Sequence, residues 1–137
     1  MAFWLMKSEP NVWSWDQQVK KGTESWTGVR NYQAANNMKA MAIGDQAFFY
    51  HSNIGKEIVG IVKISKLYYP DPTDETGKFG MVDVTAVNPL KRPVTLADIK
   101  NTPALKNMAL LKQSRLSVSA VTPAEWDIIL SLSQTPR

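Results

Sequence analysis

Four short segments of this chain bring hydrogen-bonding side chains together with aromatic or basic ones. They are residues 7–10 (Lys-Ser-Glu-Pro), 25–32 (Ser-Trp-Thr-Gly-Val-Arg-Asn-Tyr), 49–52 (Phe-Tyr-His-Ser) and 115–118 (Arg-Leu-Ser-Val). Three of these segments lie at the ends of expected strands, where a side chain is held rigidly while its tip stays exposed. Aromatic faces beside polar tips are suited to recognising a nucleobase by stacking and hydrogen bonding.

Trp26 is the first of these residues to weigh, because it lies in a polar stretch between Glu24-Ser25 and Thr27-Gly28. It can serve as a stacking platform for a base or as a wall against a methyl group. A tryptophan folded back onto the core from a loop fits the sequence equally well, since large aromatic side chains are mostly buried. Of the other tryptophans, we assign Trp13, Trp15 and Trp126 mainly to the core, and Trp4 fits either interpretation.

Lys7, Ser8 and Glu9 follow an apolar stretch and precede Pro10. The proline keeps Glu9 extended, so that its carboxylate projects at a fixed angle. A carboxylate can accept a hydrogen bond from an exocyclic amine such as that of cytosine, and Ser8 can donate or accept. The alternative is a surface loop with a Lys7–Glu9 contact that contributes little to stability. Without further context, the residues favour this second interpretation.

Arg30, Asn31 and Tyr32 stand where a helix is expected to begin. Asn31 is a candidate N-cap, which is its structural role if it has no other. A basic side chain near a helix N-terminus adds to a favourable place for phosphate, which makes Arg30 a candidate contact at the rim of a binding site. Arg115 is a second candidate of the same kind.

Tyr50 and His51 lie on an aromatic strand and could stack on a ligand, bind it by hydrogen bonds, or fill the interior. A lone histidine on a strand more often has a satisfied structural role than a ligand-binding one. Ser52 and Ser117 are ambiguous when each is taken alone.

The sequence lacks the common sets of catalytic residues. With no cysteine, it has no disulfide, thiolate metal site or cysteine nucleophile. Its one histidine, His51, excludes a site with several histidine ligands and is the only histidine available to a catalytic triad. The glycines are dispersed and form no phosphate-binding loop. Asp71, Asp74 and Glu75 fall in an expected loop, where a solvated surface is the simplest interpretation. We therefore predict no catalytic residues, no metal and no cofactor.

Length and composition indicate one globular domain over residues 1–137, because 44% hydrophobic residues suffice for a core and 20% charged residues argue against disorder. Sixteen Lys+Arg against twelve Asp+Glu give a net charge of +4, which suits a polyanionic partner but equally a solvated basic surface. No apolar run reaches membrane-spanning length, and residues 1–8 lack the features of a signal peptide. We expect a soluble, intracellular monomer, cytoplasmic if the chain is bacterial.

Apolar periodicity and capping signals predict the elements that hold these residues. Strands are expected at residues 2–6, 46–51, 57–67, 79–87 and 115–121. The strand at 57–67 is apolar on both faces, as in a small barrel. A first helix is expected from the capping pattern at Ser14 to Gly22, and a second over 31–41, with a stop signal at Gly44. Further short helices are expected to begin after Thr95, at Pro103 and after Thr122, and the tail from Ser133 is expected to be loose. This order is not alternating, which favours an α+β fold over a doubly wound sheet.

Taken together and in order, these segments resemble the EVE domain family. The matching stretches are residues 4–10, 26–34, 50–52, 59–61, 69–72 and 115–118, so the resemblance spans nearly the whole chain. Each stretch alone is weak, whereas the ordered set is specific.

The resemblance implies a PUA-like pseudo-β-barrel of about five to six mostly antiparallel strands with short flanking helices, related to ASCH and YTH domains. It implies a non-enzymatic reader that binds a flipped, modified base of nucleic acid, a modified cytosine in DNA above all, in an aromatic pocket. By this similarity the pocket comprises Lys7, Ser8, Glu9, Trp26, Arg30, Asn31, Tyr32, Tyr50, His51, Ser52 and Ser117. An RNA-binding module and a hydrolase acting on modified nucleosides are the alternatives.

Overall fold

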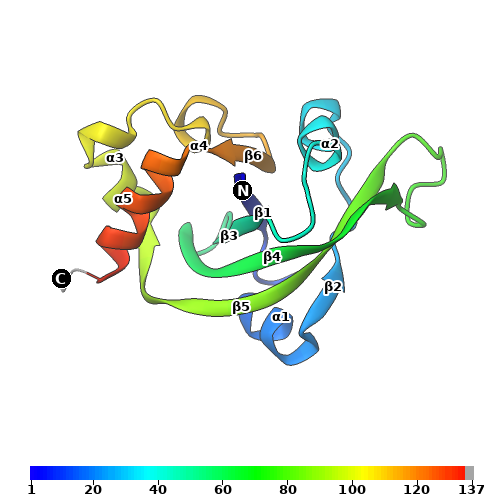
Figure 1. Ribbon diagram of the computed structural model, residues 1–137, viewed down its shortest axis with the longest axis horizontal. Coiled ribbons are helices and arrows are strands. Elements are labelled where there is room, and N and C mark those ends of the chain that lie inside the picture. Colours follow the sequence, from blue (N-terminus) through cyan, green and yellow to red (C-terminus); the bar gives the residue numbers. More distant parts are fainter. Residues whose placement is uncertain (135–137) are drawn as a thin grey trace.

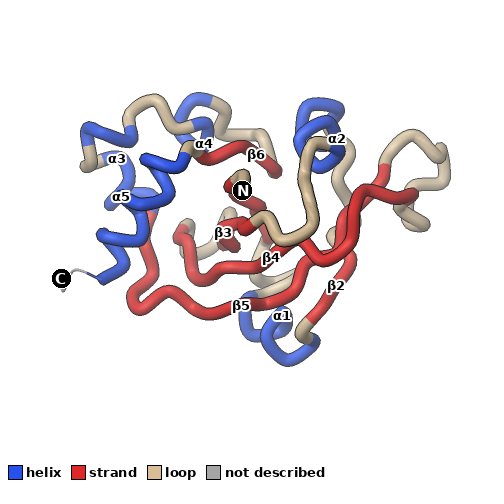
Figure 2. Tube along the Cα trace, in the orientation of Figure 1, coloured by secondary structure: helices blue, strands red, loops and turns tan. Residues whose placement is uncertain are grey.

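Six strands form one mixed sheet in the order β2-β5-β4-β3-β1-β6 (Figures 1 and 2). The structure is a computed structural model, and it describes residues 1–134. The strands are β1 (Phe3–Ser8), β2 (Thr23–Ser25), β3 (Gln46–His51), β4 (Glu57–Pro70), β5 (Gly80–Thr95) and β6 (Val118–Val121).

Within the described residues, β1 and β3 are the only strands that pair in parallel, and the other four pairings are antiparallel. Register shifts interrupt the β4–β5 ladder at four places, and Figure 1 shows these two long strands curving around β1 and β3. Among residues 1–134, no ladder joins β6 back to β2, so the curved sheet stays open. The prediction of an α+β fold with mostly antiparallel strands is confirmed.

Short helices flank the sheet on more than one side (Figure 1). They are α1 (Trp15–Lys21), α2 (Tyr32–Lys39), α3 (Leu96–Lys100), the 3-10 turn η1 (Pro103–Leu105), α4 (Ala109–Lys112) and α5 (Pro123–Gln134). Helix α1 lies beside β2 and β5, whereas α3, α4 and α5 gather at the upper left of Figure 1.

The core has two parts because the central strands bury both faces. Along β1, Trp4 and Met6 belong to one cluster while Leu5, between them, belongs to the other. The same alternation places Phe49 with the first cluster and Phe48 with the second. The sequence-based expectation that residues 57–67 are buried on both faces is confirmed for residues 57–62, where β4 contributes to both clusters, whereas Lys63 and residues 65–67 are exposed.

Three helices begin where the capping signals predict. The Ser14 side chain accepts from the Gln17 N–H while the Gln17 side chain accepts from the Ser14 N–H, and Thr95 with Asp98 repeats this capping box. Thr122 and Glu125 form the same reciprocal pair at α5. These bonds join residues three apart, so the local sequence is enough to predict them.

Several expected boundaries are wrong. Strand β1 continues to Ser8 instead of ending at residue 6, and β6 begins at Val118 rather than Arg115. The three-residue strand β2 was not expected, because its pairing with β5 is not a property of its own sequence. Helix α2 ends at Lys39, before the expected 41, and Gly44 lies in a later turn with a φ of 90°. Ser133 and Gln134 continue α5, and the remainder of the expected loose tail is outside the described residues.

Strand β5 extends to Thr95, eight residues beyond the expected end at 87. Pro89 and Pro93 argue against a strand there, because proline cannot donate to a ladder. The neighbour β2 pairs only with residues 83–85, which leaves the distal part of β5 with β4 as its sheet partner. An edge position of this kind tolerates proline. Pro70 likewise ends β4 opposite Gly80, inside a stretch that was expected to be loop.

Candidate functional site

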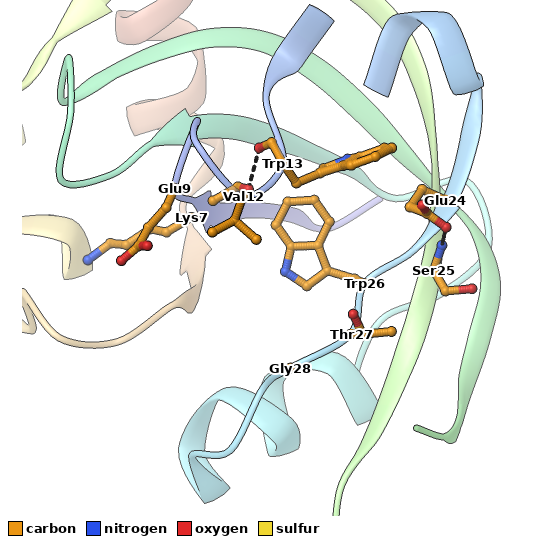
Figure 3. A pocket seen from close by; sticks show the side chains of 10 residues that line it. Lys7, Glu9, Val12, Trp13, Glu24, Ser25, Trp26, Thr27 and Gly28 are labelled. Atoms are coloured by element: carbon orange, nitrogen blue, oxygen red, sulfur yellow. Dashed lines mark hydrogen bonds between the residues drawn. The ribbon is translucent and has the colours of Figure 1, made fainter. Parts of the chain in front are cut away.

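A cavity of about 470 Å³ opens where the end of β1 faces the loop after β2. Its volume is in the range of small-ligand sites. Its lining residues come from two stretches of chain: Lys7, Ser8, Glu9, Val12 and Trp13 from the first, and Glu24, Ser25, Trp26, Thr27 and Gly28 from the second. Figure 3 shows Trp13 and Trp26 side by side at its centre, and we call it the tryptophan cavity.

Trp26 belongs to the core and also lines the tryptophan cavity. Its side chain is only 7% exposed and belongs to the first core cluster, where its ring meets Phe49 edge to face with centroids 5.5 Å apart. Its backbone N–H donates to the Val82 carbonyl, 2.8 Å away, which fixes the start of the loop against β5. The part of the ring that is not buried lines the cavity. Trp26 is therefore a rigid wall whose position the core determines.

Trp13 is only half-buried, so its expected assignment to the core is half right. One side packs against the first core cluster and the other lines the tryptophan cavity. Its indole N–H donates to Gln18 Oε1 at 2.9 Å, and the Ser8 hydroxyl donates to its carbonyl at 2.5 Å. The fully buried Gln18 in turn donates to the Gly22 and Val84 carbonyls. The only signal in the sequence was that Trp13 precedes the helix cap rather than lying within a periodic apolar pattern.

Lys7, Ser8 and Glu9 line the tryptophan cavity. The Lys7 ammonium donates to the Ser114 carbonyl at 2.8 Å, and partial burial lowers the pKa of this amine from its ordinary value.

The Glu9 carbonyl accepts from the N–H groups of Val12 and Trp13, which closes the turn after β1, while the Glu9 side chain is exposed. In Figure 3 the tips of Lys7 and Glu9 lie on the side away from Glu24 and Ser25.

Ser52, His51 and Ser117 lie next to the end of β1 but do not line the cavity. The Ser52 N–H donates to the Ser8 carbonyl and the Ser117 carbonyl accepts from the Lys7 N–H, each at 2.9 Å. His51 Nε2 accepts from the Trp15 N–H at 3.0 Å, so this nitrogen is unprotonated. Burial lowers the pKa of His51, although nearby Glu57 and Asp16 act in the opposite direction. His51, Ser52 and Ser117 therefore belong to the framework around the end of β1 and the start of α1.

Tyr50 lies farther away, in the second core cluster. Its side chain is 3% exposed, and burial raises the pKa of its hydroxyl. Successive residues of a strand point to opposite faces, which is why Phe49 packs against Trp26 whereas Tyr50 does not.

Arg30, Asn31 and Tyr32 also lie outside the lining of the cavity. The Asn31 side chain caps α2 by accepting from the Ala34 N–H at 2.9 Å, as expected. Tyr32 is 64% exposed, and its ring stands 4.9 Å from that of Phe79. Arg115, the second predicted rim residue, is exposed.

The Arg30 guanidinium is engaged in an ion pair with Asp71, which the sequence placed on a solvated loop. That expectation is wrong, because the Asp71 side chain is fully buried. Its carboxylate accepts from the Gly28 N–H at 2.9 Å, from Arg30 at 3.1 Å, and from the N–H and hydroxyl of Thr73. Burial raises the pKa of this carboxyl, but the bonds from Thr73, Gly28 and Arg30 outweigh it and lower the pKa to about 2. Asp71 thus ties the rim of the cavity to the β4–β5 loop.

Within residues 1–134, no cluster of three or more His, Cys, Asp or Glu side chains could hold a metal ion. Over the same residues, no helix is both long and apolar enough to cross a membrane.

The sequence model of the EVE domain matches residues 2–132. Thymocyte nuclear protein 1 of Homo sapiens is 37% identical, and the alignment covers 97% of this chain and 74% of that protein. A crystal structure of human THYN1 in complex with DNA that contains 5-methylcytosine has a TM-score of 0.90 at 37% identity, with all of both chains covered.

The fold is shared with bacterial proteins as well. The crystal structure of an Agrobacterium tumefaciens protein is 49% identical with a TM-score of 0.96, covering 98% of this chain and 94% of that one. A more distant likeness, to an ASCH protein of Zymomonas mobilis, has 14% identity and a TM-score of 0.59 over 96% of this chain and 95% of that one. This likeness confirms the expected kinship of fold with ASCH domains.

Proposed function

Since this chain belongs to the EVE domain family, we propose that it binds nucleic acid without catalysis and takes one flipped, modified base into the tryptophan cavity. A modified cytosine in DNA is the proposed ligand. The observation that carries the proposal is the convergence of two tryptophans, from segments on either side of α1, on one cavity with polar groups at its edge. The human relative in complex with 5-methylcytosine-containing DNA supports the choice of ligand.

The energetics of such binding are favourable on general grounds. Extracting a base from a duplex costs a few kcal/mol. Stacking against an aromatic side chain returns about 1–3 kcal/mol, and contacts of basic residues with phosphates add a salt-dependent contribution. The net charge of +4 suits this last contribution. The modification then decides between bases, because a methyl group fills apolar space whereas a polar substituent needs a hydrogen-bonding partner.

In this proposal the predicted site residues fall into three groups. Lys7, Ser8, Glu9 and Trp26 line the cavity and are proposed to contact the base. A second group lies outside the lining and is proposed to contact the adjoining sugar-phosphate backbone: Arg30, Asn31, Tyr32 and Arg115. The third group is proposed to hold the cavity-lining residues in place: Tyr50, His51, Ser52 and Ser117.

Trp13→Ala is the sharpest test of the cavity. This side chain is half-buried, so its removal disturbs the core less than Trp26→Ala, for which a buried tryptophan costs about 3–5 kcal/mol of stability. We expect Trp13→Ala to weaken binding of a 5-methylcytosine oligonucleotide by about tenfold to a hundredfold at fixed salt, from the lost stacking. Binding is measured by fluorescence anisotropy, with circular dichroism to verify the fold.

Tyr32→Ala is the control, because it removes an exposed aromatic side chain outside the cavity. Its effect on affinity should be smaller and independent of the base. Unchanged affinity of a folded Trp13→Ala protein would refute the cavity as the binding site. An RNA of the same sequence that binds more tightly than the DNA would favour the RNA-binding alternative instead.

A further inference from the structure

The two tryptophans of the tryptophan cavity differ in how much of each ring a ligand can reach. Trp26 is 7% exposed and its ring is packed against Phe49, which leaves too little surface for a base to stack on. Trp13 is half-buried and presents more of its surface. We therefore assign stacking to Trp13, while Trp26 offers a ligand only the small part of its surface that stays exposed.

The edge of Trp26 carries a free hydrogen-bond donor. The Trp13 indole N–H donates to Gln18 Oε1 at 2.9 Å, whereas Trp26 Nε1 has no hydrogen-bond partner within residues 1–134. In that part of the chain Ser119 Oγ is the buried side-chain atom without a partner, so the unpartnered Trp26 Nε1 is not buried but reached by solvent. Because Trp26 is otherwise enclosed by the core and lines the cavity, its N–H opens into the cavity.

The other stretch of the lining, residues 7–13, presents hydrogen-bond acceptors. The Ser8 hydroxyl donates a hydrogen bond to the Trp13 carbonyl at 2.5 Å. Toward a ligand, its oxygen can therefore act only as an acceptor. Glu9 carries a carboxylate on an exposed side chain. In Figure 3 the indole nitrogen of Trp26 lies on the edge of the ring turned toward Lys7 and Glu9 and away from Glu24 and Ser25. A donor and acceptors thus lie on the same side of the cavity.

We propose that the Trp26 Nε1–H determines specificity by donating to the ring nitrogen of a base whose neighbouring exocyclic amine donates to Ser8 or Glu9. This inference rests on the proposed function and refines it. Cytosine and adenine carry an amino donor beside a ring-nitrogen acceptor on the pairing edge. Thymine and guanine carry a carbonyl beside a ring N–H, so they would set donor against donor at Trp26 and acceptor against acceptor at Ser8.

The experiment is a double-mutant cycle between protein and base. Oligonucleotides identical except at one position carry 5-methylcytosine, its 3-deaza analogue, in which C–H replaces the ring nitrogen, or thymine. Each is titrated against the wild type and against Trp26→Phe, which keeps an aromatic ring but lacks the N–H. Trp13→Phe is the matched control, because the indole N–H that it removes binds Gln18 rather than the cavity.

We expect the wild type to bind 5-methylcytosine about threefold to tenfold more tightly than the 3-deaza analogue, the value of one neutral hydrogen bond, and thymine more weakly still. Trp26→Phe should bind the first two oligonucleotides equally, whereas Trp13→Phe should keep the preference. A preference that persists in Trp26→Phe overturns the inference.

A second measurement needs no variant. In ¹H–¹⁵N spectra of the wild type, the indole signal of Trp26 should shift and gain protection from exchange when the 5-methylcytosine oligonucleotide is added, and the indole N–H of Trp13 should remain bonded to Gln18. Binding with an unprotected Trp26 indole N–H refutes the inference alone. Absence of binding to any of the three oligonucleotides refutes the proposed function itself.

Discussion

Asp71 gives the most quantitative prediction, because one buried carboxylate joins two distant loops. It accepts from Gly28 and Arg30 on the loop after β2 and from Thr73 on the loop after β4. Its pKa is lowered from 3.8 to about 2 in the folded protein. A group whose pKa is lower in the folded state stabilises it above the unfolded pKa, and this contribution is lost as the pH falls through the folded pKa. This lowering of the pKa from 3.8 to about 2 corresponds to about 2–3 kcal/mol.

Asp71→Asn removes the charge and turns an amide N–H₂ toward groups that donate. We expect the variant to be less stable than the wild type by about 2 kcal/mol at pH 7 and pH 5, with the difference shrinking toward zero near pH 2. Urea unfolding at pH 7, 5, 3 and 2, followed by circular dichroism, measures both curves. The loop of Trp26 and Gly28 loses its anchor as well, so affinity for the 5-methylcytosine oligonucleotide should fall together with stability.

Asp74→Asn is the matched control in the same loop. Asp74 accepts from Thr76 and from the Phe79 N–H, and these bonds stay within one loop rather than joining two. Its substitution should change stability less and leave the cavity intact. Equal stability of Asp71→Asn and wild type at pH 7, or a difference that stays constant down to pH 2, would refute the argument.

Two further predictions concern the framework behind the cavity. Gly60→Ala should lower the free energy of unfolding in urea by about 1–3 kcal/mol, because an added Cβ would overlap the buried ring of Trp15. If the variant is as stable as the wild type, the Trp15 ring can move aside and this reasoning is wrong. His51→Gln should flatten the loss of stability between pH 7 and pH 5, since burial lowers the pKa of His51 below 6.5, so that the unfolded chain binds a proton that the folded chain does not. A wild type whose stability does not decline over that interval would contradict this account.

Signals within a few residues were sufficient for much of the fold. Ser14, Thr95 and Thr122 were recognised as helix caps because each bonds to a residue three positions later. The strand at 46–51 and the strand beginning at residue 57 follow from β-branched and aromatic composition and from the turn between them. The order of these elements favoured the α+β fold.

The errors arise where partners distant in sequence decide. Strand β2 exists because β5 pairs with it, some sixty residues later, and β5 runs past Pro89 because its flank there is an edge of the sheet. From the sequence, Asp71 is predicted to be a solvated loop residue, because its partners Arg30 and Gly28 are about forty residues away in the chain. Charge and composition of a loop say nothing about which other loop covers it.

The sequence by itself determined which residues can contribute to a binding site, namely the polar residues 7–9 and the isolated Trp26. It also excluded cysteine chemistry and a site with several histidines. Only the tertiary structure decided which of them meet. It brought Trp13 and Trp26 to one cavity, turned Tyr50 into the second core cluster, and bound Arg30 to Asp71. The physical reason is that side-chain chemistry and local hydrogen bonds are properties of neighbouring residues. Burial and proximity, in contrast, depend on how the curved sheet folds distant segments against one another.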